Sequence, residues 1–71
     1  MIKILSYNET YEILRVLFTT TDTVYEYQNV TPYMVKRLEG FIKRKNWSRA
    51  VRLLKNISTY KKLDVLEVNK K

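Results

Sequence analysis

Hydrophobic and polar residues alternate with a period of two along the first half of the chain. In residues 12–18, Leu14, Val16 and Phe18 share one side of an extended strand. A second stretch rich in β-branched and aromatic residues covers residues 23–28. A short Thr-rich tract separates the two, so an antiparallel hairpin over about residues 11–28 is the simplest connection. Since no Asn-Gly or Asp-Gly pair fixes the turn type, the register must come from side-chain burial.

The pattern changes to helical spacing after residue 30. Thr31 is a good N-cap, and Pro32 suits the first helical position because its missing N–H would lack a partner there in any case. Apolar residues then recur at spacings of three and four, which predicts an amphipathic helix over about residues 32–45. Asn46 can cap a second amphipathic helix over about residues 47–56. One kinked helix is the alternative to two, and we favour two.

Short apolar runs near both ends of the chain predict terminal strands. Residues 2–5 form one such run. Residues 57–68 contain another, for which a further helical turn is the alternative. The whole pattern predicts a single α+β domain over residues 1–71, in which a small antiparallel sheet packs against two amphipathic helices.

The sheet has a second apolar face in this arrangement. Ile13, Leu17 and Val24 would lie on the side opposite Leu14 and Val16. Either the chain termini fold over this face or a homodimer forms through the sheet, and the sequence leaves both open.

The composition is that of a folded chain with a strong positive charge. Of the 71 residues, 45% are hydrophobic and 13% are aromatic. Fourteen Lys and Arg residues against seven Asp and Glu residues give a net charge of +7. The charge is unevenly distributed, since residues 36–55 hold eight basic residues against Glu39 alone. Such a field attracts polyanions.

The residue types present argue against catalysis and against cofactors. The chain has no His and no Cys, so it has no disulfide, no soft metal ligand and none of the usual side chains that titrate near neutral pH. The seven carboxylates show no metal-ligand spacing, and the single glycine, Gly40, cannot build a phosphate-binding loop. We expect a protein that is not an enzyme and needs no cofactor or metal.

No targeting or membrane signal is visible either. No stretch approaches the length of a membrane span, and the N-terminal residues lack a signal-peptide cleavage pattern. We therefore expect a cytoplasmic protein with no membrane partner.

The basic residues of the two predicted helices form the main functional signal. They recur on the outer helix faces, where few acidic residues accompany them, although ordinary solvated helices mix both signs. Tyr33 stands beside them as a stacking platform for an unpaired base. The candidate nucleic-acid-binding residues are Tyr33, Lys36, Arg37, Lys43, Arg44, Lys45, Arg49, Arg52 and Lys55. The alternative is that these residues only form the solvent-exposed faces of two amphipathic helices. We favour the functional interpretation.

Other notable residues have a structural interpretation. Tyr25 and Tyr27 alternate as strand residues and Trp47 lies on an apolar stripe, so all three are assigned to the core. Gly40 would allow the close approach of a phosphate or a partner, but a local break or neutral drift is the simpler explanation.

The stretch LRVLF followed by VYEYQNVTP, between Leu14 and Pro32, resembles the start of the KTSC domain. That family is named for its similarity to the C-terminal region of some lysyl-tRNA synthetases. The matching positions are Leu14, Val16, Phe18, Tyr25, Tyr27, Val30 and Pro32. In the second half the chain has KRKNW where family members carry a Ser and a Gly before an aromatic, so only Trp47 corresponds. The resemblance implies a compact domain of a hairpin and a helical pair, with a suspected role in nucleic-acid binding.

Two hypotheses follow from the sequence. The first is a small basic protein that binds DNA or RNA by gripping phosphates with its helical face, with little base selectivity. The second is a protein-interaction module, such as a small phage or viral regulator or inhibitor, that docks the same face on an acidic protein partner.

Overall fold

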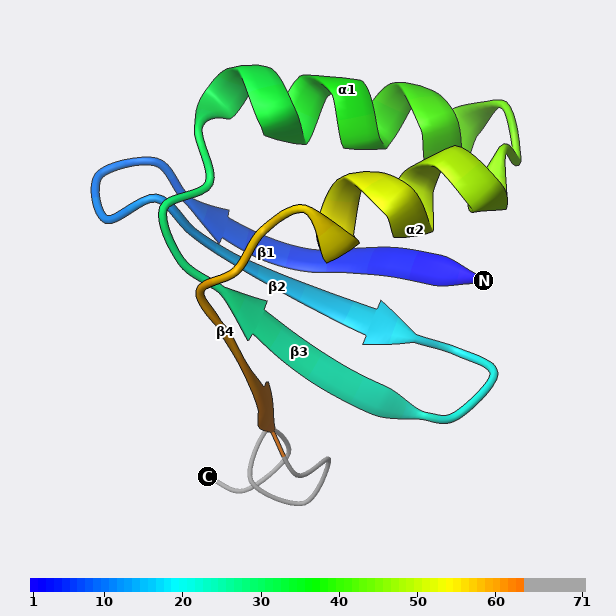
Figure 1. Ribbon diagram of the computed structural model, residues 1–71, viewed down its shortest axis with the longest axis horizontal. Coiled ribbons are helices and arrows are strands. Elements are labelled where there is room, and N and C mark those ends of the chain that lie inside the picture. Colours follow the sequence, from blue (N-terminus) through cyan, green and yellow to red (C-terminus); the bar gives the residue numbers. More distant parts are fainter. Residues whose placement is uncertain (64–71) are drawn as a thin grey trace.

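A four-stranded antiparallel sheet with two helices on one face forms the fold (Figure 1). The computed structural model describes residues 1–63. The strands lie in the order in which they occur in the chain: β1 (Ile2–Asn8), β2 (Ile13–Phe18), β3 (Thr23–Tyr27) and β4 (Tyr60–Leu63). Helices α1 (Pro32–Lys43) and α2 (Trp47–Lys55) connect β3 to β4. The predicted α+β class and the order of its elements are confirmed.

The central hairpin has the predicted position, and its register places the tyrosines on the helix side. Strand β2 pairs with β3 so that Leu14 lies opposite Tyr27 and Val16 lies opposite Tyr25. The four-residue loop between the strands ends at Asp22, whose φ of 53° is left-handed. Aspartate tolerates this conformation better than most residues, which lets the loop close without glycine.

Strand β1 is longer than the predicted run of residues 2–5 because of a bulge. The pairing with β2 shifts between Ile4 and Ser6, so Leu5 falls out of alternation and is exposed. The strand then continues to Asn8, with Tyr7 opposite Leu14 on the helix side. The apolar run in the sequence therefore ends at Leu5 because the bulge lies there, whereas the strand itself ends at Asn8.

Both helices begin at the predicted caps. The Thr31 side chain accepts a hydrogen bond from the Met34 N–H at 3.3 Å, and the Asn46 side chain accepts one from the Arg49 N–H at 3.4 Å. Helix α1 ends at Lys43, two residues before the predicted end, and α2 ends at Lys55. The prediction of two helices is correct.

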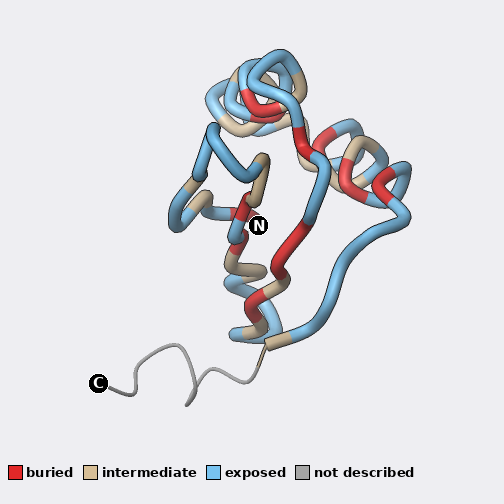
Figure 2. Tube along the Cα trace, turned by 90° about the vertical axis from the view of Figure 1, so that its left-hand side faces the viewer, coloured by how far each residue is buried: buried red, intermediate tan, exposed pale blue. Residues whose placement is uncertain are grey.

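The core lies between the helix side of the sheet and the inner faces of α1 and α2. Its largest fully buried side chains come from the sheet, from both helices and from the segment between β3 and α1, and Figure 2 marks the buried residues along the chain. These largest side chains are Leu14, Val16, Val30, Leu38 and Leu54. Tyr27 belongs to this cluster at 5% exposure, while Tyr25 and Trp47 pack against it half-buried. The assignment of these three aromatic residues to the core is therefore confirmed.

The opposite face of the sheet mixes apolar and charged residues. Leu17 lies opposite Val24, and beside them the Arg15 Nε donates to a carboxylate oxygen of Glu26 at 3.0 Å. Val24 is only 2% exposed within a single chain. A second subunit is therefore not needed to bury Val24, and the homodimer through the sheet stays a prediction.

The last described strand, β4, falls within residues 57–68, for which the sequence predicts a C-terminal strand. Strand β4 pairs with β3 from Tyr60 to Leu63. The remainder of that prediction, residues 64–68, lies outside the described residues. Among residues 1–63, no helix is both long enough and apolar enough to cross a lipid bilayer.

Candidate nucleic-acid interface

Helices α1 and α2 pack against each other and form a shallow hollow of about 340 Å³ along their junction. Arg37 projects from α1, and Arg49 and Arg52 project from α2. The apolar residues Phe41 and Leu53 also line the hollow. We call this hollow the basic groove, and its lining is Arg37, Phe41, Arg49, Arg52, Leu53 and Asn56.

The amphipathic spacing of α2 accounts for the position of its two arginines. Ala50 and Leu54 are buried in the core, which fixes the inner side of the helix. Arg49 and Arg52, three residues apart, are exposed and reach the groove from the other side. Two arginines of one helix thus converge with one arginine of the neighbouring helix.

Two aromatic rings lie beside the arginine of α1. The guanidinium carbon of Arg37 lies 5.9 Å from the centre of the Tyr33 ring and 5.7 Å from the centre of the Phe41 ring. Both distances are within the range of a cation–π contact. The planar guanidinium is itself pre-organised, so it loses less side-chain entropy for each hydrogen bond that it makes to an anion.

The structure brings together only part of the predicted basic set. All nine predicted residues are exposed, and Arg37, Arg49 and Arg52 meet in the groove. Those that do not line the groove are Tyr33, Lys36, Lys43, Arg44, Lys45 and Lys55. Within residues 1–63 the one ion pair joins Arg15 to Glu26, so no described carboxylate neutralises the groove arginines.

Lys55 extends the positive surface over α2 toward the sheet. Together with Arg52, it lines a second hollow of about 480 Å³ beside Trp47, Ser48 and Val51. Arg52 belongs to this hollow and to the basic groove. Arg52 therefore links the basic groove to this second hollow, which Lys55 also lines.

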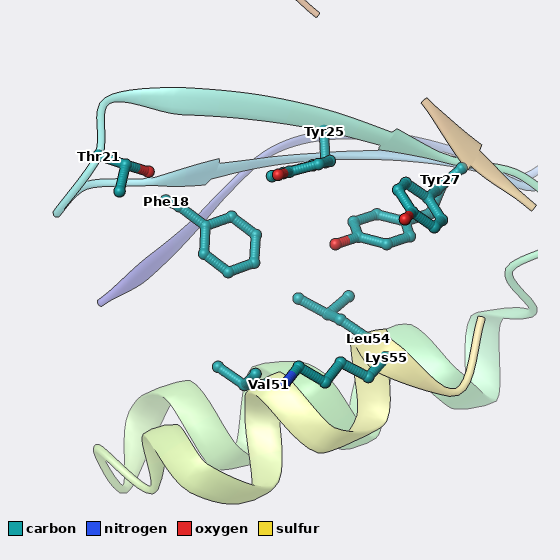
Figure 3. Close-up of a pocket in the computed structure, with 8 residues that line it drawn as sticks. Phe18, Thr21, Tyr25, Tyr27, Val51, Leu54 and Lys55 are labelled. Atoms are coloured by element: carbon teal, nitrogen blue, oxygen red, sulfur yellow. The ribbon is translucent and has the colours of Figure 1, made fainter. Parts of the chain in front are cut away.

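Beyond Lys55 lies a more apolar pocket of about 390 Å³, between α2 and the sheet. Figure 3 shows Phe18, Tyr25 and Tyr27 on the side of the sheet that faces α2, and Val51 and Leu54 extending from α2 toward them. We call it the aromatic pocket, and its lining is Phe18, Thr21, Tyr25, Tyr27, Val51, Leu54, Lys55 and Tyr60.

The strand tyrosines at this pocket were assigned by sequence to the core alone. Tyr27 is buried, and its burial, together with the neighbouring Tyr25 and Tyr60, raises its pKa to about 12. Tyr60, in contrast, is 57% exposed. Tyr60 is followed directly by two lysines in the sequence, after the second helix. A tyrosine beside two basic residues could have indicated a further exposed aromatic residue.

The groove and the pocket offer no evident metal-binding chemistry. Among residues 1–63, no three acidic side chains gather in a way that could hold a metal ion. The groove is suited to anions because guanidinium groups carry five N–H donors in a planar fork.

Comparison with protein-family models, with curated proteins and with solved structures found no match for this chain. The resemblance to the KTSC domain therefore stays a prediction from the residues between Leu14 and Pro32.

Proposed function

We propose that this protein is a non-catalytic nucleic-acid-binding protein whose basic groove grips the phosphate backbone of DNA or RNA. One observation carries the proposal. Arg37, Arg49 and Arg52 come from two different helices and line one hollow, where no described carboxylate pairs with them. Three like charges held together repel one another, and an anion that binds between them relieves the repulsion.

The chemistry of the groove suits phosphate oxygens. Each guanidinium can donate two parallel hydrogen bonds to one phosphate. The contacts carry little base selectivity because phosphates are the same at every position of a strand. Lys36, Lys43, Arg44 and Lys45 are exposed outside the groove and add to the field that attracts the strand.

The proposal is tested by fluorescence anisotropy with labelled single- and double-stranded DNA and RNA at several salt concentrations, with heparin as a general polyanion. Each phosphate that a basic side chain neutralises should make the slope of log affinity against log salt more negative by about 0.9 on duplex DNA. Replacing both α2 arginines, Arg49→Ala with Arg52→Ala, should weaken binding and make that slope less negative by about 0.9 for each arginine that binds a phosphate in the wild type.

A matched variant separates the groove from the total charge. Lys36→Ala with Lys43→Ala also removes two charges, from exposed positions of α1 that do not line the groove. It should weaken binding less than the arginine pair does. Equal effects of the two variants would contradict the groove as the binding site, and the absence of any binding at low salt would overturn the proposed function itself.

A further inference from the structure

The aromatic pocket is built differently from the basic groove. Four aromatic residues, Phe18, Tyr25, Tyr27 and Tyr60, line it, and Lys55 is its one charged residue. Its volume of about 390 Å³ lies at the lower end of the range of small-ligand sites, about 300–1,000 Å³. Mostly apolar and aromatic walls with a few polar groups, here Lys55 and the hydroxyl groups of Thr21 and the tyrosines, are typical of a small-ligand site.

The rings in the pocket do not stack in parallel on one another. Phe18 meets Tyr25 edge to face, with ring centres 5.3 Å apart and planes at 74°. Tyr60 lies 5.9 Å from Tyr25 at 62° and 5.9 Å from Tyr27 at 37°. Each of these contacts takes up part of a ring surface, and Tyr27 is only 5% exposed, so the surface left for another ring is mainly that of Tyr60, which is 57% exposed.

The two aromatic rings beside the groove already have a cationic partner. The Arg37 guanidinium lies over both Tyr33 and Phe41. At Tyr60, in contrast, an unpaired base would compete with no cation–π contact among the described residues. The path between the groove and the pocket is positively charged, because Arg52 lines the groove and the intermediate hollow, and Lys55 lines that hollow and the pocket.

We infer that the aromatic pocket holds an unpaired nucleobase of the strand whose phosphates lie in the basic groove, an inference that rests on the proposed function. Tyr60 would stack on the base, and the Lys55 ammonium group, on the α2 side of the pocket (Figure 3), would contact the adjoining phosphate. The protein would accordingly prefer single-stranded nucleic acid, since the bases of a duplex are paired and stacked.

The test compares Tyr60→Leu, which removes the exposed ring but keeps an apolar side chain, with Tyr11→Leu. Tyr11 is 72% exposed and does not line the aromatic pocket. Stacking of one base contributes about 1–3 kcal/mol, so Tyr60→Leu should weaken single-strand binding about 5- to 150-fold. Duplex affinity and its salt slope should stay unchanged, and Tyr11→Leu should behave as the wild type.

A second measurement uses the unaltered protein. In a single strand with one 2-aminopurine, fluorescence should be quenched when that base occupies the pocket, and an abasic site at the same position should weaken binding. A mononucleotide, adenosine monophosphate, should bind far more weakly than the strand because it cannot also occupy the groove.

The results distinguish the base pocket from the function on which it rests. If the arginine variants weaken binding while Tyr60→Leu, the abasic site and 2-aminopurine have no effect, the base pocket is refuted and the phosphate groove stands. If a mononucleotide binds as tightly as the strand, the pocket serves a free nucleotide and the inference is also wrong. If no nucleic acid binds at low salt, both proposals fall together.

Discussion

Burial changes the ionisation of Tyr27. Its side chain is 5% exposed in the core, and desolvation, with smaller contributions from Tyr25 and Tyr60, raises its pKa from 10.0 to about 12. As the pH rises above 10, the unfolded chain loses this phenolic proton before the folded chain does. The free energy of unfolding should therefore be constant with respect to Tyr27 below pH 10 and should fall between about pH 10 and pH 12.

The variant Tyr27→Phe isolates that contribution, because lysines and other tyrosines also titrate at alkaline pH. Its unfolding free energy, measured by urea denaturation at a series of pH values, should decline less steeply than that of the wild type in this range. Tyr11→Phe, which removes an exposed hydroxyl, should keep the wild-type decline. Parallel curves for all three proteins would show that the Tyr27 hydroxyl ionises as freely in the folded chain as in the unfolded one.

At the scale of elements, the turn between α1 and α2 stores backbone strain. Lys45 has a φ of 57°, a left-handed conformation that costs a non-glycine residue roughly 1 kcal/mol. The Lys45 N–H donates to the Ile42 carbonyl at 3.0 Å, and the Asn46 N–H donates to the Phe41 carbonyl at 2.8 Å. These two bonds form a Schellman motif, in which glycine usually occupies the position of Lys45.

Two substitutions of Lys45 remove the same charge and differ only in backbone freedom. Lys45→Gly should be more stable than Lys45→Ala by about 1 kcal/mol, which corresponds to roughly 4–8 °C in melting temperature for a domain of this size. The same pair at Lys36, inside α1, should rank in the opposite order, because glycine costs about 1 kcal/mol relative to alanine in a helix interior. The same order at both positions would mean that the turn is not strained at Lys45.

The sequence predicts those elements that local residues determine. Thr31, Pro32 and Asn46 mark the helix starts because capping involves only neighbouring residues. The end of α1 was placed two residues late because a lysine in the left-handed conformation gives no signal comparable to glycine. The bulge at Leu5 was missed because it depends on the pairing with β2.

The candidate site shows the same limit more strongly. The basic positions were visible in the sequence, but periodicity does not reveal how two helices pack. Arg37, Arg49 and Arg52 meet only because α1 and α2 lie against each other, and Lys36 and Lys43 remain outside the groove. Tyr60 reaches the aromatic pocket through the pairing of β4 with β3, a contact between segments far apart in the chain.

The whole molecule separates its charges. Four of the acidic residues lie in the strands and turns that precede α1, whereas the segment from Lys36 to Lys55 carries eight basic residues and only Glu39. Folding gathers these positive charges on one pair of helices, and the unfolded chain spreads them apart. Their repulsion is therefore greater in the folded state and is screened by salt.

Stability and binding should respond to salt with opposite signs. The screening length shortens from about 30 Å at 0.01 M salt to about 10 Å at 0.1 M. Because exposed charge pairs interact by up to about 1 kcal/mol, we expect sodium chloride in this range to raise the melting temperature by several degrees. Over the same range it should weaken nucleic-acid binding, because the release of counterions into a more concentrated solution is less favourable.

The variant with Arg49→Ala and Arg52→Ala tests whether the groove is a main source of this repulsion. At 0.01 M salt it should melt at a higher temperature than the wild type and gain less from added salt, even though it binds nucleic acid more weakly. Lys36→Ala with Lys43→Ala, with the same net charge, should show a smaller rise because the charges it removes lie outside the groove. If the melting temperature rose equally in both variants, the repulsion would depend on the net charge alone. A lower melting temperature for the arginine variant at low salt would mean that the two arginines stabilise the fold instead of straining it.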